Sequence, residues 1–242
     1  MTAPGQGDKP QGIEFYGGYP VYSESGVDLT LLRQNLRRTA EQRWADASRG
    51  AALFTGFRRT RRGQSGQSSM ESGEQGVFNP QGLVQRLHER NVEFVVIGGL
   101  AMIAHGSAYL TKDLDVCYNR IPANLAALVE ALTPLHPYLR GAPAGLPFRF
   151  DVPTLQAGLN FTLTTDFGDL DLLGEVSGVG TYAQVFAQSD ACTLFDMPIR
   201  ILSIDGLIAA KKAAGRNKDR SHLLELEELK KLRDADSAGQ DS

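Results

Sequence analysis

Apolar residues along this chain follow two spacings, which predict the strands and helices of one folded region between residues 79 and 232. Short apolar runs bounded by glycine or polar residues indicate strands, and apolar residues repeated every three or four positions indicate helices. We expect strands at 92–98 and 114–119 and two more within 159–176, joined by a tight turn at Asp166 to Gly168. We expect helices at 80–90, from the glycine pair at 98–99 to about Gly106, and at 121–135, 204–214 and 219–232.

Local signals at the ends of the helices support this division. Asn79-Pro80 combines an N-cap residue with a proline at the first helical position. Ser203 is the expected N-cap of the helix at 204–214, and Gly215 is expected to end it. The resulting order of elements predicts an α/β (α+β) protein with a mixed β-sheet flanked by helices.

The residues outside this region divide by composition. Residues 1–20 are rich in Gly, Pro and polar residues, and we expect them to be disordered. Residues 21–62 predict a small helical segment, capped by Asp28 and with an apolar face that consists of Leu29, Leu32, Leu36 and Trp44. Residues 63–76 have almost no aliphatic side chains and predict a flexible linker. The folded domain then spans 77–232, and 233–242 predicts a disordered tail.

Composition and charge narrow the class of protein. Of the 242 residues, 42% are hydrophobic and 22% are charged, and the formal net charge is −3, which is typical of a globular protein without a general attraction for nucleic acid. The first residues lack the basic and apolar regions of a signal peptide. The longest apolar stretch, 94–104, is shorter than the roughly 20 residues that span a bilayer. We therefore expect a cytoplasmic protein.

Two pairs of aspartates carry the strongest chemical signal. Asp113 and Asp115 flank one leucine on a predicted strand, so their carboxylates project from the same face. Like charges this close repel each other unless a cation neutralises them, and oxygen ligands favour Mg²⁺ or Mn²⁺. Asp169 and Asp171 repeat the spacing and would complete a metal site if the two strands are neighbours. The alternative is that each pair simply lies at a solvated strand end.

The glycine pair at 98–99 adds a second signal. A strand, two glycines and a helix form a turn in which the backbone can approach a phosphate closely, and the N-terminus of the helix offers free N–H groups. The alternative is a simple tight turn, because the spacing is neither that of a dinucleotide fingerprint nor that of a P-loop. The order is the informative feature: strand, Gly-Gly, short helix, then Asp-Leu-Asp on the next strand.

These blocks resemble the signature of the nucleotidyltransferase superfamily that includes DNA polymerase β. The similarity is greatest to the minimal and AbiEii-like bacterial members found in toxin–antitoxin systems, and it extends from Asn79 to Leu232. The motifs that carry it are VIGGLAMIAHGSAYLTKDLDV at 96–116, LNFTLTTDFGDLDLL at 159–173 and LSIDGLIAAKKAAGRNKDRSHLLEL at 202–226. The resemblance implies a nucleotidyltransferase fold, NTP as substrate and Mg²⁺ or Mn²⁺ as cofactor.

The resemblance also implies roles for particular residues. Gly98 and Gly99 would hold the triphosphate, Asp113 and Asp115 would bind the catalytic metals, and Asp171 would be the third carboxylate, which helps to activate the attacking hydroxyl. Asp169 is the weaker candidate for that third position.

A block of cations around the end of the helix at 204–214 also matches the family and would bind the nucleotide. It consists of Lys211, Arg216 and Lys218, with Asp219 beside them. Without the resemblance, Lys211 would be assigned to a solvated helix face.

Two residues depart from the pattern of the family. Tyr109 stands where many relatives have an arginine, which puts one nucleotide or acceptor contact in doubt. Asn217 stands in place of a proline and exchanges one helix-start residue for another. The other motifs of the family block are retained.

The resulting functional hypothesis is a metal-dependent transferase. It would move an NMP from an NTP to a hydroxyl of tRNA or of a partner protein, such as a cognate toxin or antitoxin. A basic cluster at 58–62 could bind RNA phosphates or be a solvated tail. The alternatives are a non-catalytic antitoxin-like module of the same fold and a transferase that modifies small antibiotics. A Rossmann-type oxidoreductase is disfavoured by the absence of a G-x-G-x-x-G motif.

Limited proteolysis tests the domain boundary. We expect the first cuts within 63–76, with release of a stable fragment that begins near Val77, because this stretch has no apolar face to hold it against a core. Mass spectrometry of the fragments identifies the sites. Initial cleavage after Leu173, with 63–76 intact, would show that the boundary is misplaced.

Overall fold

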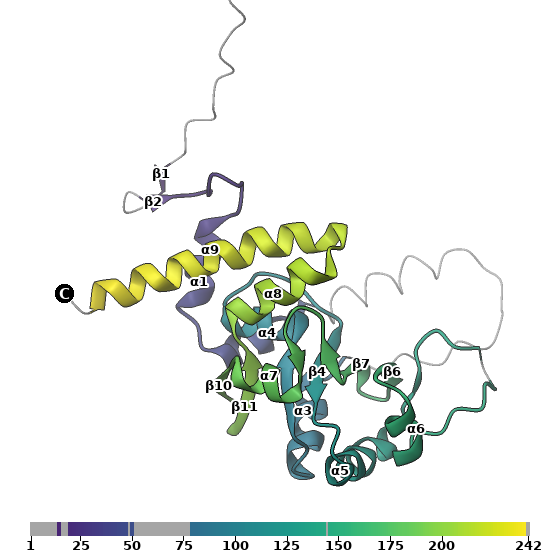
Figure 1. Ribbon diagram of the computed structural model, residues 1–242. Helices are drawn as coiled ribbons and strands as arrows, with labels where there is room; N and C mark the ends of the chain where they lie inside the picture. Colours follow the sequence, from purple (N-terminus) through teal and green to yellow (C-terminus); the bar gives the residue numbers. More distant parts are fainter. Residues whose placement is uncertain (1–13, 16–18, 48, 51–77, 144, 241–242) are drawn as a thin grey trace, which may run out of the picture.

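The computed structural model describes residues 14–15, 19–47, 49–50, 78–143 and 145–240 (Figure 1). The expected linker at 63–76 and the basic cluster at 58–62 lie outside these ranges.

The strands are β1 Glu14–Phe15, β2 Tyr19–Pro20, β3 Phe94–Ile97, β4 Asp113–Tyr118, β5 Tyr138–Leu139, β6 Asn160–Thr165, β7 Gly168–Leu173, β8 Glu175–Val176, β9 Gly180–Thr181, β10 Ser189–Leu194 and β11 Met197–Leu202. The helices are α1 Leu29–Leu36, α3 Pro80–Glu89, α4 Gly98–His105, α5 Pro122–Leu132, α6 Val152–Ala157, α7 Tyr182–Ala187, α8 Ile204–Ala214 and α9 Asn217–Gln240, with a 3-10 turn at Thr133–Leu135.

The central sheet is mixed, as the order of elements predicted. Its seven strands run in the order β10-β11-β3-β4-β7-β6-β5. The β11–β3 and β4–β7 pairs are parallel, and the other neighbours are antiparallel. Two further two-stranded sheets, β1-β2 and β8-β9, lie apart from it. Within the described ranges, none of the helices has the length and apolar character needed to cross a membrane.

The core lies on both sides of the middle strands. All four residues of β3 are buried, because α4 and α7 both pack against this strand. In β7 only every second residue is buried, namely Gly168, Leu170 and Leu172. Asp169 and Asp171 occupy the other face, which is partly open. In β7, this alternation places apolar residues on the buried side of the strand and the two aspartates on the partly open side.

In the described part of the N-terminal segment, α1 is followed by a second stretch of helical geometry. α1 is capped by the side chain of Asp28, as expected, and ends at Leu36. Residues 37–39 interrupt the helix, and helical geometry resumes over 40–47 and 49–50. Thr39 and Gln42 bond reciprocally to each other's backbone N–H groups, which starts the second helix. Leu29, Leu32 and Trp44 are buried in the main core.

The sequence patterns missed the β10–β11 hairpin. Its two-residue turn is Phe195-Asp196, and both residues have positive φ angles, 54° and 60°. Such a turn is normally marked by Asn-Gly or Asp-Gly, and Phe-Asp lacks this pattern. Pro198 is tolerated in β11 because this strand pairs with β3 only at Ile201, and the proline therefore lies outside that pairing.

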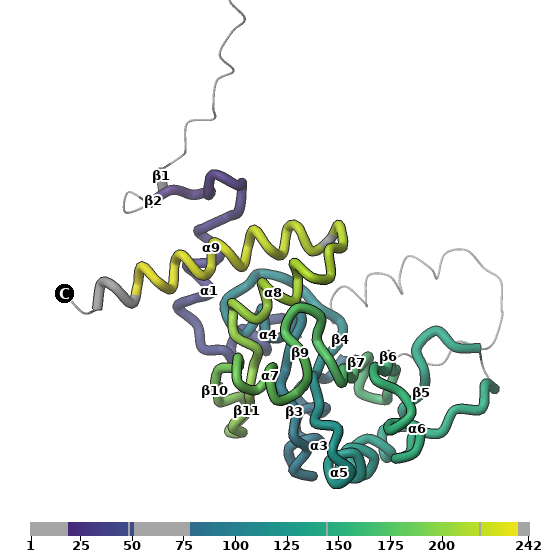
Figure 2. Tube along the Cα trace, viewed as in Figure 1, coloured from purple at the N-terminus to yellow at the C-terminus, as the bar shows by residue number. Residues whose placement is uncertain are grey.

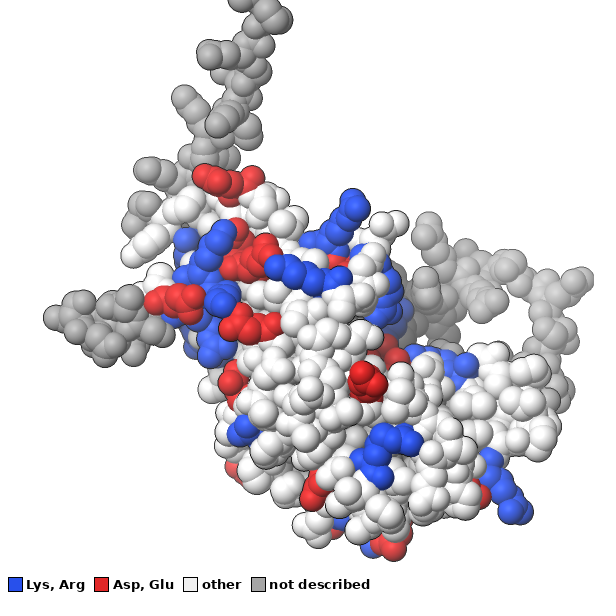
Figure 3. Space-filling view, viewed as in Figure 1, with Lys and Arg blue, Asp and Glu red and all other residues white. Residues whose placement is uncertain are grey.

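The last helix was expected to end at Leu232, with a disordered tail from 233. Instead α9 begins at Asn217 and continues to Gln240. Figures 1 and 2 show α9 lying across α1, with α8 beneath it, and contacts join it to both helices. Acidic and basic side chains mix over this part of the surface in Figure 3. Lys230 pairs with Asp205 and Lys231 with Glu228, so part of this charge is neutralised locally.

His105 ends α4 as a buried structural residue. It is 4% exposed, and its Nε2–H donates to the carbonyl of Leu202 at 2.9 Å. Its Nδ1 lies 3.0 Å from a guanidinium nitrogen of Arg233, which donates to it. Burial lowers the pKa of His105, and the positive charges of Arg233 and Arg43 lower it further. The imidazole is therefore held neutral in the folded protein.

This environment predicts a pH effect on stability. Because the pKa of His105 is lower in the folded than in the unfolded chain, the unfolded chain takes up the proton first as pH falls below about 6.5. We expect wild type to lose more free energy of unfolding between pH 8 and pH 5 than His105→Gln. The difference is bounded by about 1.4 kcal/mol for each pH unit. Denaturant titrations at each pH measure it, and parallel curves would contradict the assignment.

Candidate metal and phosphate site

Four carboxylates meet on one face of the sheet because β4 and β7 are parallel neighbours. In the register of this pair, Asp113 lies opposite Asp169 and Asp115 lies opposite Asp171. Leu114 and Leu170 point to the other side and are fully buried. The sequence expectation required the two Asp-Leu-Asp strands to be adjacent, and the structure confirms that adjacency.

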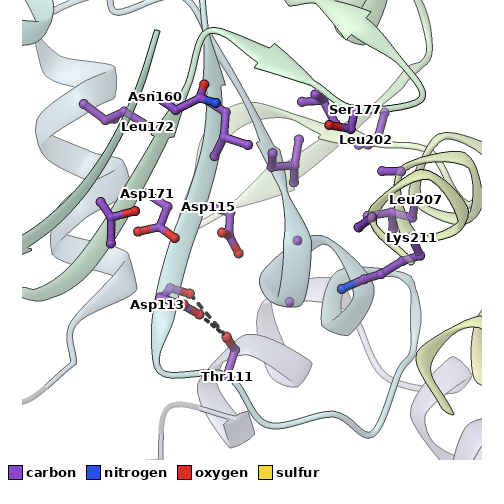
Figure 4. Close-up of a pocket in the computed structure, with 18 of the residues that line it drawn as sticks. Thr111, Asp113, Asp115, Asn160, Asp171, Leu172, Ser177, Leu202, Leu207 and Lys211 are labelled. Carbon is purple, nitrogen blue, oxygen red and sulfur yellow. Dashed lines mark hydrogen bonds between the residues drawn. The ribbon is translucent and has the colours of Figure 1, made fainter. Parts of the chain in front are cut away.

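Three of the four carboxylates can reach a common point. Oxygens of Asp113, Asp115 and Asp171 all lie within 4.8 Å of one another. Figure 4 shows these side chains converging beside the glycine turn. An all-oxygen set of this kind suits Mg²⁺ or Mn²⁺ better than a soft metal. The donor set therefore fits the divalent cation that the sequence analysis expected, while Asp169 stands outside the group.

Of the clustered carboxylates, Asp115 has the most strongly raised pKa. Burial raises the pKa of Asp115 to about 7, and the negative charges of Asp113 and Asp171 add to that increase. The backbone N–H of Gly99 and the Lys211 ammonium act in the opposite direction. Burial also raises the pKa of Asp171 above its ordinary value, although Arg140 opposes the shift. Burial and mutual repulsion thus both oppose ionisation of these carboxylates.

The double glycine brings the backbone into contact with this cluster. Gly98 has a φ of +62°, and a Cβ built on it would lie 2.0 Å from Oδ2 of Asp115. A Cβ on Gly99 would lie 2.7 Å from the side chain of Thr111. Any side chain at these positions would displace the residues that form the site. The glycines are therefore required by close approach as well as by backbone conformation.

The cations that the sequence analysis expected are only partly gathered at the site. Lys211 on α8 lines the cleft and pairs with Asp219 at 3.1 Å. Arg216 also lines the cleft and contacts Asp219 at 3.3 Å through its side chain. Burial would raise the pKa of Asp219, but Lys211 and Arg216 outweigh it and lower the pKa. Lys218 belongs to α9, and its side chain lies outside the described part of the chain.

Two residues near the carboxylates escaped the sequence analysis. Thr111 donates its hydroxyl to Oδ1 of Asp113 at 2.6 Å and so orients that carboxylate. Arg140, at the end of β5, contacts Asp171 at 2.7 Å and Asp169 at 3.1 Å. The position of Thr111 two residues before the first aspartate was a usable signal. Arg140 lies in a stretch without a motif, and only the sheet topology brings it to the site.

The site lies in a cleft of about 460 Å³. One wall carries the glycine turn and the carboxylates, and the opposite wall carries Lys211 and Leu207 of α8 (Figure 4). The upper part is lined by Asn160, Leu172 and Ser177. Tyr109, which stands where many members of the resembling family have an arginine, also lines the cleft and contacts His222 edge-to-face, with 4.4 Å between ring centroids. The cleft therefore combines an acidic wall with an opposite wall that carries both a cation and apolar side chains.

No family model matches the chain, and no curated protein matches it. A crystal structure of the lincosamide antibiotic adenylyltransferase LnuA with lincomycin bound is similar at a TM-score of 0.43 and 10% identity, covering 63% of this chain and 98% of that chain. The solution structure of the antibiotic-resistance factor ANT(2'')-Ia is similar at a TM-score of 0.37 and 14% identity, covering 66% and 92%. Neither similarity assigns a substrate to this chain.

Substitution of the first glycine tests the close approach. Gly98→Ala places a methyl group against Asp115, whereas Gly141→Ala is a matched control with a similar φ of +77° and nothing within 4 Å. We expect the control to lower the free energy of unfolding by about 1–2 kcal/mol, and Gly98→Ala to cost at least about 1 kcal/mol more. Denaturant unfolding measures both. Equal losses would mean that backbone conformation alone explains the glycine.

Proposed function

We propose that this protein is a metal-dependent nucleotidyltransferase that moves an NMP from an NTP to a hydroxyl of an acceptor and releases pyrophosphate. One observation carries the proposal. The carboxylates of Asp113, Asp115 and Asp171 converge within 4.8 Å beside a glycine turn that opens a helix. A divalent cation held by these three residues would polarise the α-phosphate and lower the pKa of the attacking hydroxyl.

We propose that the triphosphate of the NTP binds at the glycine turn. α4 begins at Gly98, directly after β3, and no side chain caps its N-terminus. The backbone N–H of Gly99 bonds to Asp115, and the other N–H groups of this first turn are proposed to receive the anion, because the helix dipole favours negative charge at this end. Because neither glycine carries a Cβ, phosphate oxygens can approach the backbone closely.

We propose that the ammonium group of Lys211 binds the phosphates of the NTP. It projects from α8 across the cleft toward the carboxylates (Figure 4), and its side chain is 16% exposed. The salt bridge with Asp219 fixes the direction of the lysine, since Asp219 is only 1% exposed. The same ion pair joins α8 to α9, so the position of the ammonium depends on the packing of both helices. Arg216 is proposed to contribute at the edge of the cleft.

Asp171 is the proposed acceptor of the proton from the attacking hydroxyl. The sequence resemblance assigns this role, and the location of Asp171 on β7 is compatible with it. Figure 4 places Asp171 on the side of Asp115 that faces away from Lys211. The attacking hydroxyl would then approach from the side of Asp171, and the far end of the phosphate chain would lie on the opposite side, near Lys211. An in-line displacement needs this arrangement.

The acceptor is proposed to be tRNA or a partner protein, in a system of toxin–antitoxin type. This part of the proposal is supported by the sequence resemblance and by the basic cluster at 58–62. A small antibiotic is the competing acceptor. A non-catalytic antitoxin-like role is less favoured, because a buried carboxylate next to two others, with a pKa raised to about 7 by burial and by those neighbours, is costly to retain without a use for it.

Transfer assays test the proposal directly. Purified protein is incubated with each labelled NTP and Mg²⁺, separately with total tRNA, with cell lysate, and with lincosamide or aminoglycoside antibiotics. We expect label on one acceptor class, and we expect Asp113→Asn and Asp115→Asn to lower the transfer rate by on the order of 100-fold or more, because charged ligands of the cation are lost. Asp196→Asn makes the same chemical change in the exposed β10–β11 turn and should retain the wild-type rate.

The pattern of labelling distinguishes the candidate acceptors. Label on RNA or on a single protein supports the toxin–antitoxin proposal, and label on a drug supports the antibiotic alternative. Wild-type transfer by the folded Asp113→Asn/Asp115→Asn double variant would rule out the proposed site.

A further inference from the structure

Arg140 binds the same carboxylates that form the candidate metal site. Its guanidinium lies 2.7 Å from Oδ1 of Asp171, 3.1 Å from Oδ2 of Asp169 and 4.0 Å from Oδ2 of Asp113. One side chain therefore contacts three of the four clustered aspartates. Two of its partners, Asp113 and Asp171, also belong to the group that can reach a common ion.

The two uses of these carboxylates are in conflict. A guanidinium that donates to Oδ1 of Asp171 occupies one of the two oxygens through which this carboxylate could bind a metal ion. Its positive charge, which is fixed at all accessible pH values, also repels a divalent ion nearby. The negative charge of the cluster can be neutralised by Arg140 or by a metal, but the contacts described here do not suit both at once.

The attachment of Arg140 allows its side chain to leave. The backbone is held, because its N–H donates to the carbonyl of Thr162 at 2.9 Å and so extends the edge strand β5 along β6. Among the described residues, the ion pairs of the guanidinium all go to the clustered aspartates. The side chain is 29% exposed and thus borders solvent. Rotation about its side-chain bonds would release the carboxylates without any change in the sheet.

We propose that Arg140 is a displaceable counter-ion of the acidic cluster: it occupies the cation position in the metal-free protein and gives way when a divalent cation binds. The inference rests on the proposed function in so far as that cation is the metal of the transfer reaction. In this arrangement Arg140 stabilises the folded protein without metal and weakens its affinity for metal. Occupation of the site is then a competition between an internal and an external cation.

Metal binding without nucleotide or acceptor tests the competition. Titration with Mn²⁺, followed by calorimetry or by the electron paramagnetic resonance signal of free Mn²⁺, gives the Kd of each variant. We expect Arg140→Gln to lower the Kd by on the order of tenfold, because one neighbouring positive charge is removed. Arg149→Gln is the matched control, since it makes the same change at an exposed position in the same connection between β5 and α6, and its Kd should equal that of wild type. Arg140→Lys should remain close to wild type.

Thermal unfolding provides a second measurement. In EDTA we expect Arg140→Gln to melt below wild type, because the carboxylates lose their counter-ion, and we expect saturating Mn²⁺ to close the gap. A gap of the same size in EDTA and in Mn²⁺ would assign Arg140 a purely structural role and overturn the inference. An unchanged or raised Kd in Arg140→Gln would overturn it as well.

The outcome for wild type separates this inference from the proposed function. If wild type binds Mn²⁺ and Asp113→Asn weakens that binding, but Arg140→Gln leaves the Kd unchanged, then only the role of Arg140 is wrong. If wild type and Arg140→Gln both fail to bind Mn²⁺, the proposed metal site fails and the inference fails with it.

Discussion

The parallel pairing of β4 with β7 fixes the negative charge around which the rest of the site is arranged. Asp115 lies opposite Asp171 and Asp113 opposite Asp169, so the backbone ladder holds these carboxylates together and they cannot move apart without breaking the sheet. The surrounding groups respond to that charge. Arg140 approaches from the edge strand, Lys211 from α8, and the N–H of Gly99 from the start of α4. Each element near the cleft supplies positive charge or a hydrogen-bond donor to one shared acidic surface.

The helix that begins with the glycine pair is braced along its length. Trp44 donates its indole N–H to the carbonyl of Leu100 at 2.9 Å, and Asn35 donates to the carbonyl of Gly106 at 3.2 Å. Arg43 bonds to the carbonyl of Ala104, and His105 reaches across to β11. The contacts to Ala104 and Gly106 satisfy carbonyl groups at the C-terminal end of α4, and together with the Trp44 contact they anchor the helix to the N-terminal segment. The N-terminal segment therefore supports the position of the glycine turn, although it lies far from it in sequence.

Close backbone packing also shapes the opposite wall of the cleft. Gly178, in the turn between β8 and β9, has a φ of +80°, and a Cβ there would lie 2.6 Å from the carbonyl of Ala209 on α8. This turn therefore lies directly on the helix that carries Lys211. A salt bridge to the buried Asp219 then connects that lysine to α9. The location of one cation thus depends on three elements, and substitutions that loosen any of them are expected to affect the same side of the cleft.

The sequence alone determined the elements whose signals are local. The buried strand, the glycine pair, the Asp-Leu-Asp spacing and the caps at Asn79 and Ser203 depend on residues close together in the chain, and the structure has each of them where it was expected. Tertiary structure alone decided the rest. The Phe195-Asp196 turn has positive φ angles that neither residue type announces, and α9 extends past residues with little apolar character. No local pattern in the sequence pointed to Arg140. Its role comes from strand order, which places β5 at the edge of the sheet beside β6, and electrostatic attraction across the sheet leaves no periodic trace in the sequence.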